Sequence, residues 1–250
     1  MPDVLGWRAT VGVVTPSTNT VVQPEYDAMR PAGVTTHVAR MHIPDHPIGS
    51  DGDFDALIGR IDAALEGAVE RVLTARPDHL VLGVSAESIW GGGRAAAADI
   101  AVRVARLSGG LPLTQAADAL PAALAAYGVS GPVALLTPYF PVAEPHLRAY
   151  LAEIGHEVVA MRHLARPSPV EIGRTPLSVL RTALRELDRP EVAAIIQFGA
   201  NLPFGRIAAE AEAWLDKPVI AINTATWWHA LRSMGIADRI EGHGRLLAEF

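Results

Sequence analysis

The sequence of 250 residues contains no cysteine. Disulfide bonds, thiolate metal sites and cysteine nucleophiles are therefore excluded from its chemistry. Aromatic residues are also scarce, at 6% of the chain, although half of the residues are hydrophobic. The core must consequently be built from alanine, valine and leucine, a composition that is common where helices pack on a parallel sheet.

Basic clusters and long apolar runs are missing as well. The formal net charge is −6, and no run of lysine or arginine forms the basic stripe that is typical of nucleic-acid binding. The apolar runs fall far short of the roughly 20 residues that span a membrane. Residues 1–7 show no charged segment followed by an apolar one, as a signal peptide would. These features predict a cytoplasmic protein with no nucleic-acid partner and no membrane partner.

Short apolar runs alternate with longer amphipathic segments along the chain. The pattern predicts strands at 9–14, 36–41, 79–84, 111–114, 133–136, 157–161, 192–197 and 219–222. It predicts helices at 19–29, 54–73, 94–107, 118–127, 144–154, 176–187, 207–215 and 226–234. Strands that alternate with helices indicate βαβ units and a parallel sheet, with helices on both faces.

Two halves of the chain carry similar motifs in the same order. Each opens with a strand that ends in Thr-Pro, at 15–16 and at 137–138. Each later has a strand that ends in glycine followed by small residues, at 83–85 and at 199–201. This repetition predicts an α/β fold of two pseudo-symmetric, Rossmann-like (flavodoxin-like) halves with parallel sheets. The expected halves are 1–116 plus 223–250, and 117–222.

The segments that follow four of the predicted strands are small and polar. In open parallel sheets, ligands bind beyond the carboxyl ends of the strands. The segments at 15–20, 83–88, 137–140 and 199–202 are rich in Thr, Ser, Asn, Tyr and Gly. Hydroxyls, amides and helix N-terminal N–H groups suit a carboxylate. Because Ser, Thr and Asn also favour N-caps, a purely structural role for 15–20 and for Ser85 stays open.

These segments resemble motifs of one enzyme group. The Thr-Pro-Ser-Thr-Asn-Thr run at 15–20 resembles the opening motif of maleate cis-trans isomerases and arylmalonate decarboxylases, and Val-Gln-Pro-Glu-Tyr at 22–26 extends it. Thr-Pro-Tyr at 137–139 resembles the motif of their second half. Gly-Ala-Asn-Leu at 199–202 is similar to their Cys-Thr-Asn-Leu segment, and 228–232 resembles their final helix. The resemblance implies an Asp/Glu racemase-type fold, no cofactor and a homo-oligomer.

The chain departs from that group at its cysteines. The resemblance implies two facing cysteines, one in each half, and by motif position they would fall at Gly83 and Gly199. Reversible addition of a thiolate to a double bond cannot occur in a chain without cysteine. Reprotonation by a cysteine after decarboxylation is excluded for the same reason.

The resemblance also implies a set of site residues. Asn19, Ser85, Tyr139 and Asn201 are expected to hydrogen-bond substrate carboxylates, with help from backbone amides near Ser17 and Val84. The full set of expected substrate-binding residues is Pro16, Ser17, Asn19, Gly83, Val84, Ser85, Gly199, Ala200 and Asn201.

Glu87 and Tyr139 are the candidates for acid–base catalysis. A carboxyl group beside a substrate carboxylate has a raised pKa, which suits proton transfer near neutral pH. Glu87 could instead be an exposed turn residue, and Tyr139 an ordinary buried aromatic with a satisfied hydroxyl. No metal is expected, because the spacing of His37, His42 and His46 departs from standard zinc motifs.

The sequence therefore predicts a cofactor-independent enzyme that acts on a small carboxylate or dicarboxylate. A lyase-type reaction through an enediolate-like intermediate, either decarboxylation or hydration, is the leading hypothesis. Three alternatives stay open: a hydrolase in which Glu87 activates water, a maleate isomerase-like enzyme, and a homologue that binds carboxylates without converting them.

Overall fold

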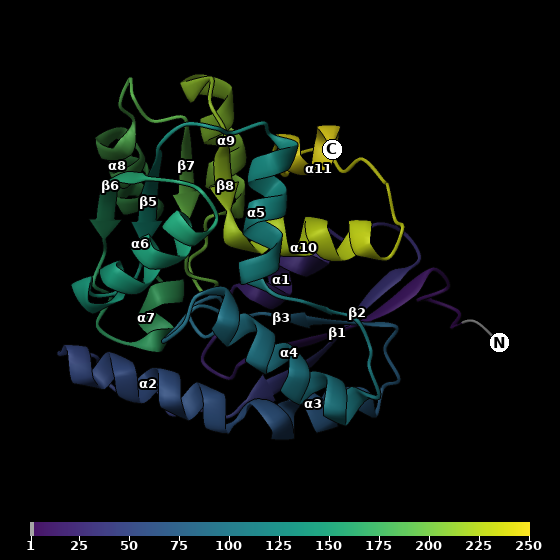
Figure 1. The fold of residues 1–250 in the computed structure, drawn as a ribbon. Coiled ribbons are helices and arrows are strands. Elements are labelled where there is room, and N and C mark those ends of the chain that lie inside the picture. The colour runs from purple at the N-terminus through teal and green to yellow at the C-terminus, as the bar shows by residue number, and fades with distance from the viewer. Residues whose placement is uncertain (1–2) are drawn as a thin grey trace.

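A computed structural model describes residues 3–250 of the chain; residues 1 and 2, which open the first predicted half, lie outside the described residues. The chain forms two four-stranded sheets in which every strand pair is parallel (Figure 1). The strands are β1 (Ala9–Pro16), β2 (Val34–Met41), β3 (His79–Leu82), β4 (Leu113–Thr114), β5 (Val133–Thr137), β6 (Val158–His163), β7 (Ala194–Gln197) and β8 (Val219–Ala221).

The helices lie between and around these strands. They are α1 (Val22–Ala28), α2 (Asp51–Ala63), α3 (Leu65–Leu73), α4 (Arg94–Ser108), α5 (Ala116–Ala126), the 3₁₀ turn η1 (Pro141–Ala143), α6 (Glu144–Glu153), α7 (Pro169–Gly173), α8 (Leu177–Leu187), α9 (Gly205–Leu215), α10 (Ile222–Ser233) and α11 (Arg245–Glu249). Among these helices of the described chain, none is both long enough and apolar enough to cross a membrane.

The two sheets have the same topology. The strand order is β2-β1-β3-β4 in one sheet and β6-β5-β7-β8 in the other. The four-residue strands β3 and β7 are buried throughout, which is typical of central strands covered on both faces. The predicted fold of two pseudo-symmetric parallel halves is confirmed; the boundaries proposed between the halves stay a prediction.

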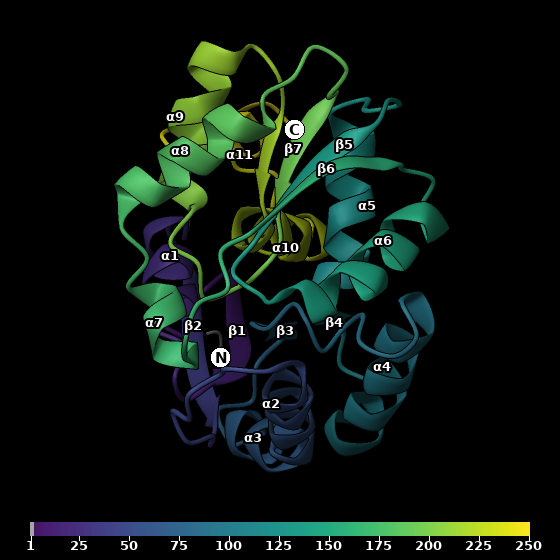
Figure 2. The same ribbon diagram turned by 90° about the vertical axis from the view of Figure 1, so that its left-hand side faces the viewer.

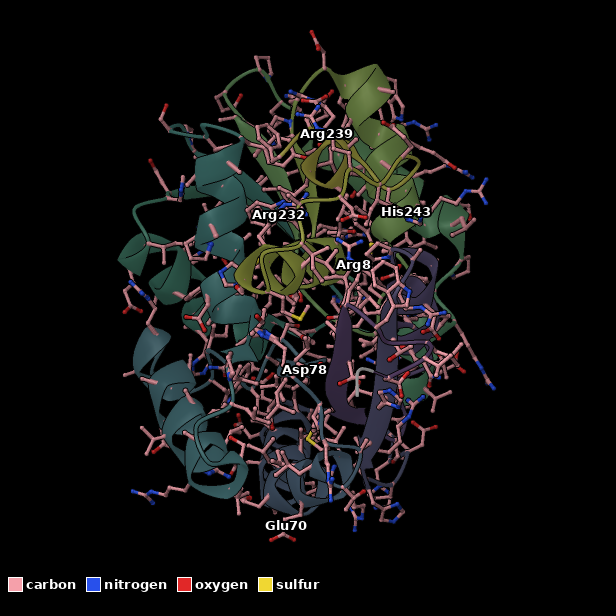
Figure 3. All side chains as sticks on the ribbon, turned by 90° about the vertical axis from the view of Figure 1, so that its right-hand side faces the viewer. Arg8, Glu70, Asp78, Arg232, Arg239 and His243 are labelled. Carbon is pink, nitrogen blue, oxygen red and sulfur yellow. The ribbon has the colours of Figure 1, made fainter. Side chains whose placement is uncertain are left out.

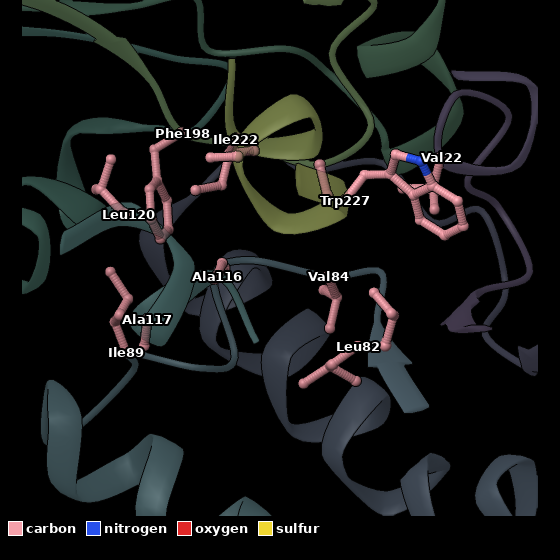
Figure 4. Packing of buried hydrophobic residues seen from close by; sticks show 14 of the residues in the cluster. Val22, Leu82, Val84, Ile89, Ala116, Ala117, Leu120, Phe198, Ile222 and Trp227 are labelled. Carbon is pink, nitrogen blue, oxygen red and sulfur yellow. The ribbon is translucent and has the colours of Figure 1, made fainter. Parts of the chain in front are cut away.

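The larger of two hydrophobic clusters joins the two halves, and the smaller one lies within the second half. Helix α10 lies between the sheets (Figure 2), and its Trp227 ring stacks on Tyr26 of α1 with the ring centroids 4.9 Å apart. Leu82 and Val84 from the first half pack in the same cluster as Phe198 and Ile222 from the second (Figure 4). This shared core fixes the halves relative to each other and hence the geometry of anything between them.

Arginine side chains form hydrogen bonds with other segments of the surface near the junction of the halves. Arg8 donates to both carboxylate oxygens of Asp238, at 2.8 and 2.5 Å. Arg232 donates to the carbonyl oxygens of Ile236 and Phe250, at 2.7 and 2.9 Å. Figure 3 shows Arg8 and Arg232 near the middle of this face, whereas Glu70 projects outward at its lower edge.

The prediction of a single helix at 54–73 is wrong. The chain forms α2 and α3 with a joint at Ala64. The apolar side of α3 covers β1 and β2, while α2 continues past that sheet toward η1 of the second half (Figure 1). One straight helix cannot pack against both bodies, so the chain changes direction between them.

Candidate active site

A cavity of about 480 Å³, counting the space at its mouth, lies where the carboxyl ends of β1, β3, β5 and β7 meet. In each sheet, two of these strands are the central pair, and the chain leaves them toward opposite edges. Such a switch point is where open α/β sheets bind ligands. The lining residues are Pro16, Thr18, Asn19, Ile43, Phe54, Leu57, Ile58, Ile61, Val84, Ala86, Pro138, Tyr139, Pro169, Ile172, Gly199, Ala200 and Asn201.

One wall of the cavity is an apolar face of α2. Phe54, Leu57, Ile58 and Ile61 follow helical spacing and turn the same side of the helix toward the cavity. Phe54 also contacts Tyr139, with the ring centroids 5.0 Å apart. Within residues 3–250, no charged side chain lines the cavity. Sequence reasoning missed this wall because a helical apolar stripe looks the same whether it faces a core or a ligand.

The loop after β1 places Asn19 in the cavity wall and Ser17 outside it. Asn19 Oδ1 accepts hydrogen bonds from the N–H groups of Val21 and Val22, both at 2.9 Å. Its Nδ2 has no hydrogen-bond partner among the residues that the structure describes, which leaves a donor for a ligand. Ser17 is exposed, and its hydroxyl bonds the N–H and the carbonyl of Ile43 at 3.0 and 3.1 Å. The structure therefore does not bring the Ser17 side chain to the cavity.

A hydrogen-bonded group at the centre of the site connects both halves. Ser85 Oγ lies 3.1 Å from Tyr139 Oη and accepts the Ala200 N–H at 3.1 Å. Ser85 itself is buried and does not line the cavity. Burial raises the pKa of the Tyr139 hydroxyl, so this group keeps its proton at neutral pH. Ser85 therefore holds a protonated Tyr139 hydroxyl in the cavity wall.

Glu87 is buried rather than exposed, so the alternative of an exposed turn residue is wrong. Its side chain is 6% exposed, and both carboxyl oxygens lack a hydrogen-bond partner within the described chain. Burial, followed by the nearby charge of Asp62, raises the pKa of Glu87 well above its ordinary value. The residue does not line the cavity, although its charge influences Tyr139 and raises the pKa of that hydroxyl further. Burial therefore favours the neutral form of this carboxyl group.

The two glycines of the strand-end motifs have no room for a side chain. A Cβ atom on Gly83 would lie 2.8 Å from Val22 Cγ1, and Gly83 does not line the cavity. Gly199 does line it, but a Cβ atom there would lie 2.3 Å from Pro138 Cδ. Its φ of +148° is also a conformation that favours glycine.

Asn201 lines the cavity and also joins the halves. Its Oδ1 accepts the Thr20 N–H at 2.9 Å, and its Nδ2 donates to the Pro169 carbonyl at 2.7 Å. Both ends of the amide are thus bound to protein, which leaves less for a ligand than the sequence reasoning expected. Pro16, Val84 and Ala200 lie in the cavity wall as that reasoning expected.

No arrangement for a metal ion stands out. Within residues 3–250, no group of three or more His, Asp or Glu side chains is placed to hold one. His42 and His46 are exposed on the loop after β2, and His37 bonds Thr35 Oγ1 at 3.1 Å.

Comparison with known proteins finds relatives of two activities. The maleate isomerase of Nocardia farcinica strain IFM 10152 is 29% identical over 248 residues, covering 96% of this chain and 95% of that protein. A structure of the Nocardia farcinica maleate cis-trans isomerase, a cysteine-to-serine variant with a covalently bound succinylcysteine intermediate, has a TM-score of 0.83 at 27% identity, covering 96% of this chain and 98% of that one. A crystal structure of arylmalonate decarboxylase shares the fold, with a TM-score of 0.74 at 22% identity, covering 95% and 98% of the two chains.

The comparison with models of whole protein families matches nearly the entire chain. The sequence profile described as arylmalonate decarboxylase matches residues 11–247, which include every strand of both sheets except the first two residues of β1. The matched region holds all the residues that line the cavity. The chain therefore belongs to the arylmalonate decarboxylase family.

Proposed function

We propose that the protein is a cofactor-independent, lyase-type enzyme that acts on a small carboxylate or dicarboxylate with an apolar substituent. The reaction passes through an enediolate-like intermediate and uses no cysteine nucleophile. One observation carries the proposal. Among the described residues no charged side chain lines the cavity, and the Asn19 and Tyr139 side chains, which follow strands of different halves, both line it. Decarboxylation fits this cavity better than hydration, for the electrostatic reason that follows.

An apolar enclosure raises the free energy of a carboxylate that enters it. The carboxylate loses hydration, and the face of α2 with Phe54, Leu57 and Ile58 offers no replacement donors. When the bond from the α-carbon to that carboxylate breaks, carbon dioxide leaves and the electron pair stays with the α-carbon. The charge then spreads over the second carboxyl group as an enediolate, which Tyr139 Oη and Asn19 Nδ2 stabilise by hydrogen bonds. Proton addition to the α-carbon completes the reaction.

Tyr139 supports the proton step in place of a thiol. Among the described lining residues, Tyr139 is the ionisable one, and its raised pKa keeps the proton available for transfer to a strongly basic carbanion-like centre. Glu87 does not line the cavity, and its carboxyl oxygens have no hydrogen-bond partner within the described chain. We infer that Glu87 does not contact the substrate, and that Tyr139 regains its proton from water that enters as the product leaves.

The alternatives have weaker support. A relative carries a succinylcysteine intermediate, and a chain without cysteine cannot form one. A hydrolase would need Glu87 as a carboxylate within reach of water, whereas burial disfavours the carboxylate form and the residue lies outside the cavity lining. A homologue that binds carboxylates without converting them stays an alternative that the assay below distinguishes.

The test is decarboxylation of phenylmalonate and methyl(phenyl)malonate, followed by proton NMR and carbon dioxide release, with maleate as a comparison substrate. Each of Tyr139→Phe and Asn19→Ala is expected to lower kcat/KM by about 10²–10³-fold, the usual effect of removing one donor to an oxyanion. Tyr127→Phe is the matched control, because Tyr127 does not line the cavity. Its Oη donates to Glu212 Oε1 at 2.6 Å. The control should change kcat/KM by less than about two-fold.

Unchanged turnover in Tyr139→Phe would overturn the assignment of this residue. Saturable binding of phenylmalonate, measured by calorimetry without any product, would instead support the non-catalytic homologue. The expected homo-oligomer and cytoplasmic location stay predictions, of which the first is checked by sedimentation.

A further inference from the structure

Glu25 lies outside the cavity lining but faces the second half of the molecule. It belongs to α1, and its carboxyl oxygens accept the Gly205 N–H at 3.0 Å and an Asn223 Nδ2 hydrogen at 2.7 Å. Gly205 begins α9, so the carboxyl group also lies at the positive end of a helix. The residue is half-buried, and its carboxyl end is the enclosed part.

Hydrogen bonds that are joined through the backbone of Ala200 connect Glu25 to the cavity. The Nδ2 group of Asn223 that donates to Glu25 also donates to the Ala200 carbonyl, at 2.9 Å. The N–H of Ala200 donates to Ser85 Oγ, which lies 3.1 Å from Tyr139 Oη. Asn223 is 3% exposed, so water does not readily replace either of its bonds. With the halves as predicted, the bonds from Asn223 to Ala200, from Ala200 to Ser85 and from Ser85 to Tyr139 each cross between them, and the last ends at the proposed proton donor.

We propose that Glu25 is a positioning residue: through Asn223 it orients the Ala200 carbonyl and, through the backbone of Ala200, the N–H group that bonds Ser85 of the Ser85–Tyr139 pair. An ionised carboxyl group accepts strong, charge-assisted hydrogen bonds and holds the Nδ2 side of Asn223 toward both acceptors. A protonated Glu25 can donate instead and favours the opposite orientation of the amide, with Oδ1 toward Glu25. The two orientations of Asn223 therefore present different atoms, Nδ2 or Oδ1, to the Ala200 carbonyl.

The protonation of Glu25 changes near neutral pH. Burial raises its pKa to about 7, against the lowering effect of the Asn223, Gly205 and Phe204 donors. The neighbouring groups are otherwise uncharged or exposed: burial, followed by the charge of Glu25, raises the pKa of Tyr26 on α1. From α10 the neighbours are Asn223 and Thr224; on α9, Arg206 is exposed and pairs with Glu210 at 3.3 Å.

The test follows the Ala200 amide directly and does not depend on turnover. Protein labelled with ¹⁵N-alanine is titrated between pH 5 and pH 9, roughly two units either side of the expected midpoint, and the Ala200 peak is assigned by its loss in Ala200→Gly. The wild-type peak is expected to shift with a midpoint near 7. Glu25→Gln should abolish that shift.

Two further variants make the result specific. Asp27→Asn is the matched control, because Asp27 is an exposed carboxyl on the same helix, and it should leave the Ala200 titration unchanged. Asn223→Ala keeps Glu25 but removes its connection to Ala200, so it should also abolish the shift even if Glu25→Gln fails to fold. A shift that persists in Asn223→Ala, or a wild-type peak without an inflection, would overturn the inference.

The consequence for catalysis rests on the proposed function and is measured separately. If phenylmalonate is a substrate, Glu25→Gln should lower kcat more than it changes KM and remove an inflection near neutral pH from the rate profile. Failure of the proposed function gives no turnover in any variant, yet leaves the Ala200 titration intact. The two failures are therefore distinguishable.

Discussion

Replacement of Gly199 by alanine tests how tightly the two halves close around the site. The new Cβ atom would lie 2.3 Å from Pro138 Cδ, so the proline ring or the end of β7 must move, and such overpacking costs about 1–3 kcal/mol. The φ of +148° adds backbone strain, which is on the order of 1–3 kcal/mol. Together the substitution should lower the free energy of unfolding by about 2–6 kcal/mol, a large part of the total stability of an average protein.

Three companion variants separate these two contributions. Gly155→Ala adds a Cβ atom in open space at a φ of +88°, so it measures backbone strain alone. Gly59→Ala adds one in open space within α2, where it should stabilise by about 0.5–1 kcal/mol. Combining Gly199→Ala with Pro138→Ala should recover the overpacking part, which appears as a coupling free energy.

Urea unfolding, followed by circular dichroism, measures the wild type, these four variants and Pro138→Ala, which the coupling free energy requires. A Gly199→Ala variant as stable as Gly155→Ala would refute the reasoning, because it would mean that the site has space for a side chain. In that case the site would also accept a cysteine at position 199 without other changes. The contact between Gly199 and Pro138 predicts instead that a thiol at this position requires accompanying changes at Pro138.

Three further predictions concern buried polar groups. The folded-state pKa of Glu87 lies above its ordinary value, so its contribution to stability is complete below about pH 4 and is lost as pH rises through the raised pKa. In urea unfolding, Glu87→Gln should therefore lose less stability than the wild type between acidic and alkaline pH. An equal loss of stability in both proteins would contradict this. Burial lowers the pKa of His79 to about 4, so the free energy of unfolding of the wild type should fall by up to about 3 kcal/mol as pH drops from 6.5 to 4. Thermal unfolding should show that His79→Gln removes most of that fall. Asn201→Ala removes the partner of the Pro169 carbonyl and of the Thr20 N–H. Pro169 is buried, so its unsatisfied carbonyl should cost about 1–3 kcal/mol in unfolding free energy, whereas water can replace the bond at the exposed Thr20. Unchanged stability with weaker ligand binding would show that Asn201 contacts the ligand and does not hold the halves together.

Most of the fold could be predicted from the sequence because hydrophobic periodicity is local. Buried strands such as β3 and β7 are short, uninterrupted apolar runs, and amphipathic helices such as α8 have regular spacing. The joint at Ala64 could not be predicted, since the apolar spacing continues through it. The five-residue helices α7 and α11 also depend on distant contacts, because helices this short are not stable alone.

The site was only partly predictable for a similar reason. Asn19, Tyr139 and Ala200 follow strand ends, and parallel topology brings strand ends together. Ser17 and Glu87 follow the same strands, yet their side chains turn away from the cavity. The direction of a loop side chain depends on what packs around it, which motif spacing does not contain.

The sequence by itself determined the absence of thiol chemistry, the two parallel halves and the group of strand ends that form the site. These follow from composition and from periodicities of two and 3.6 residues, which act over a few neighbours. Only the tertiary structure decided that α2 supplies an apolar wall, that Glu87 is enclosed with a raised pKa, and that Gly199 abuts Pro138. These depend on how the two halves pack, and packing sets the local solvation on which a pKa or a binding site depends.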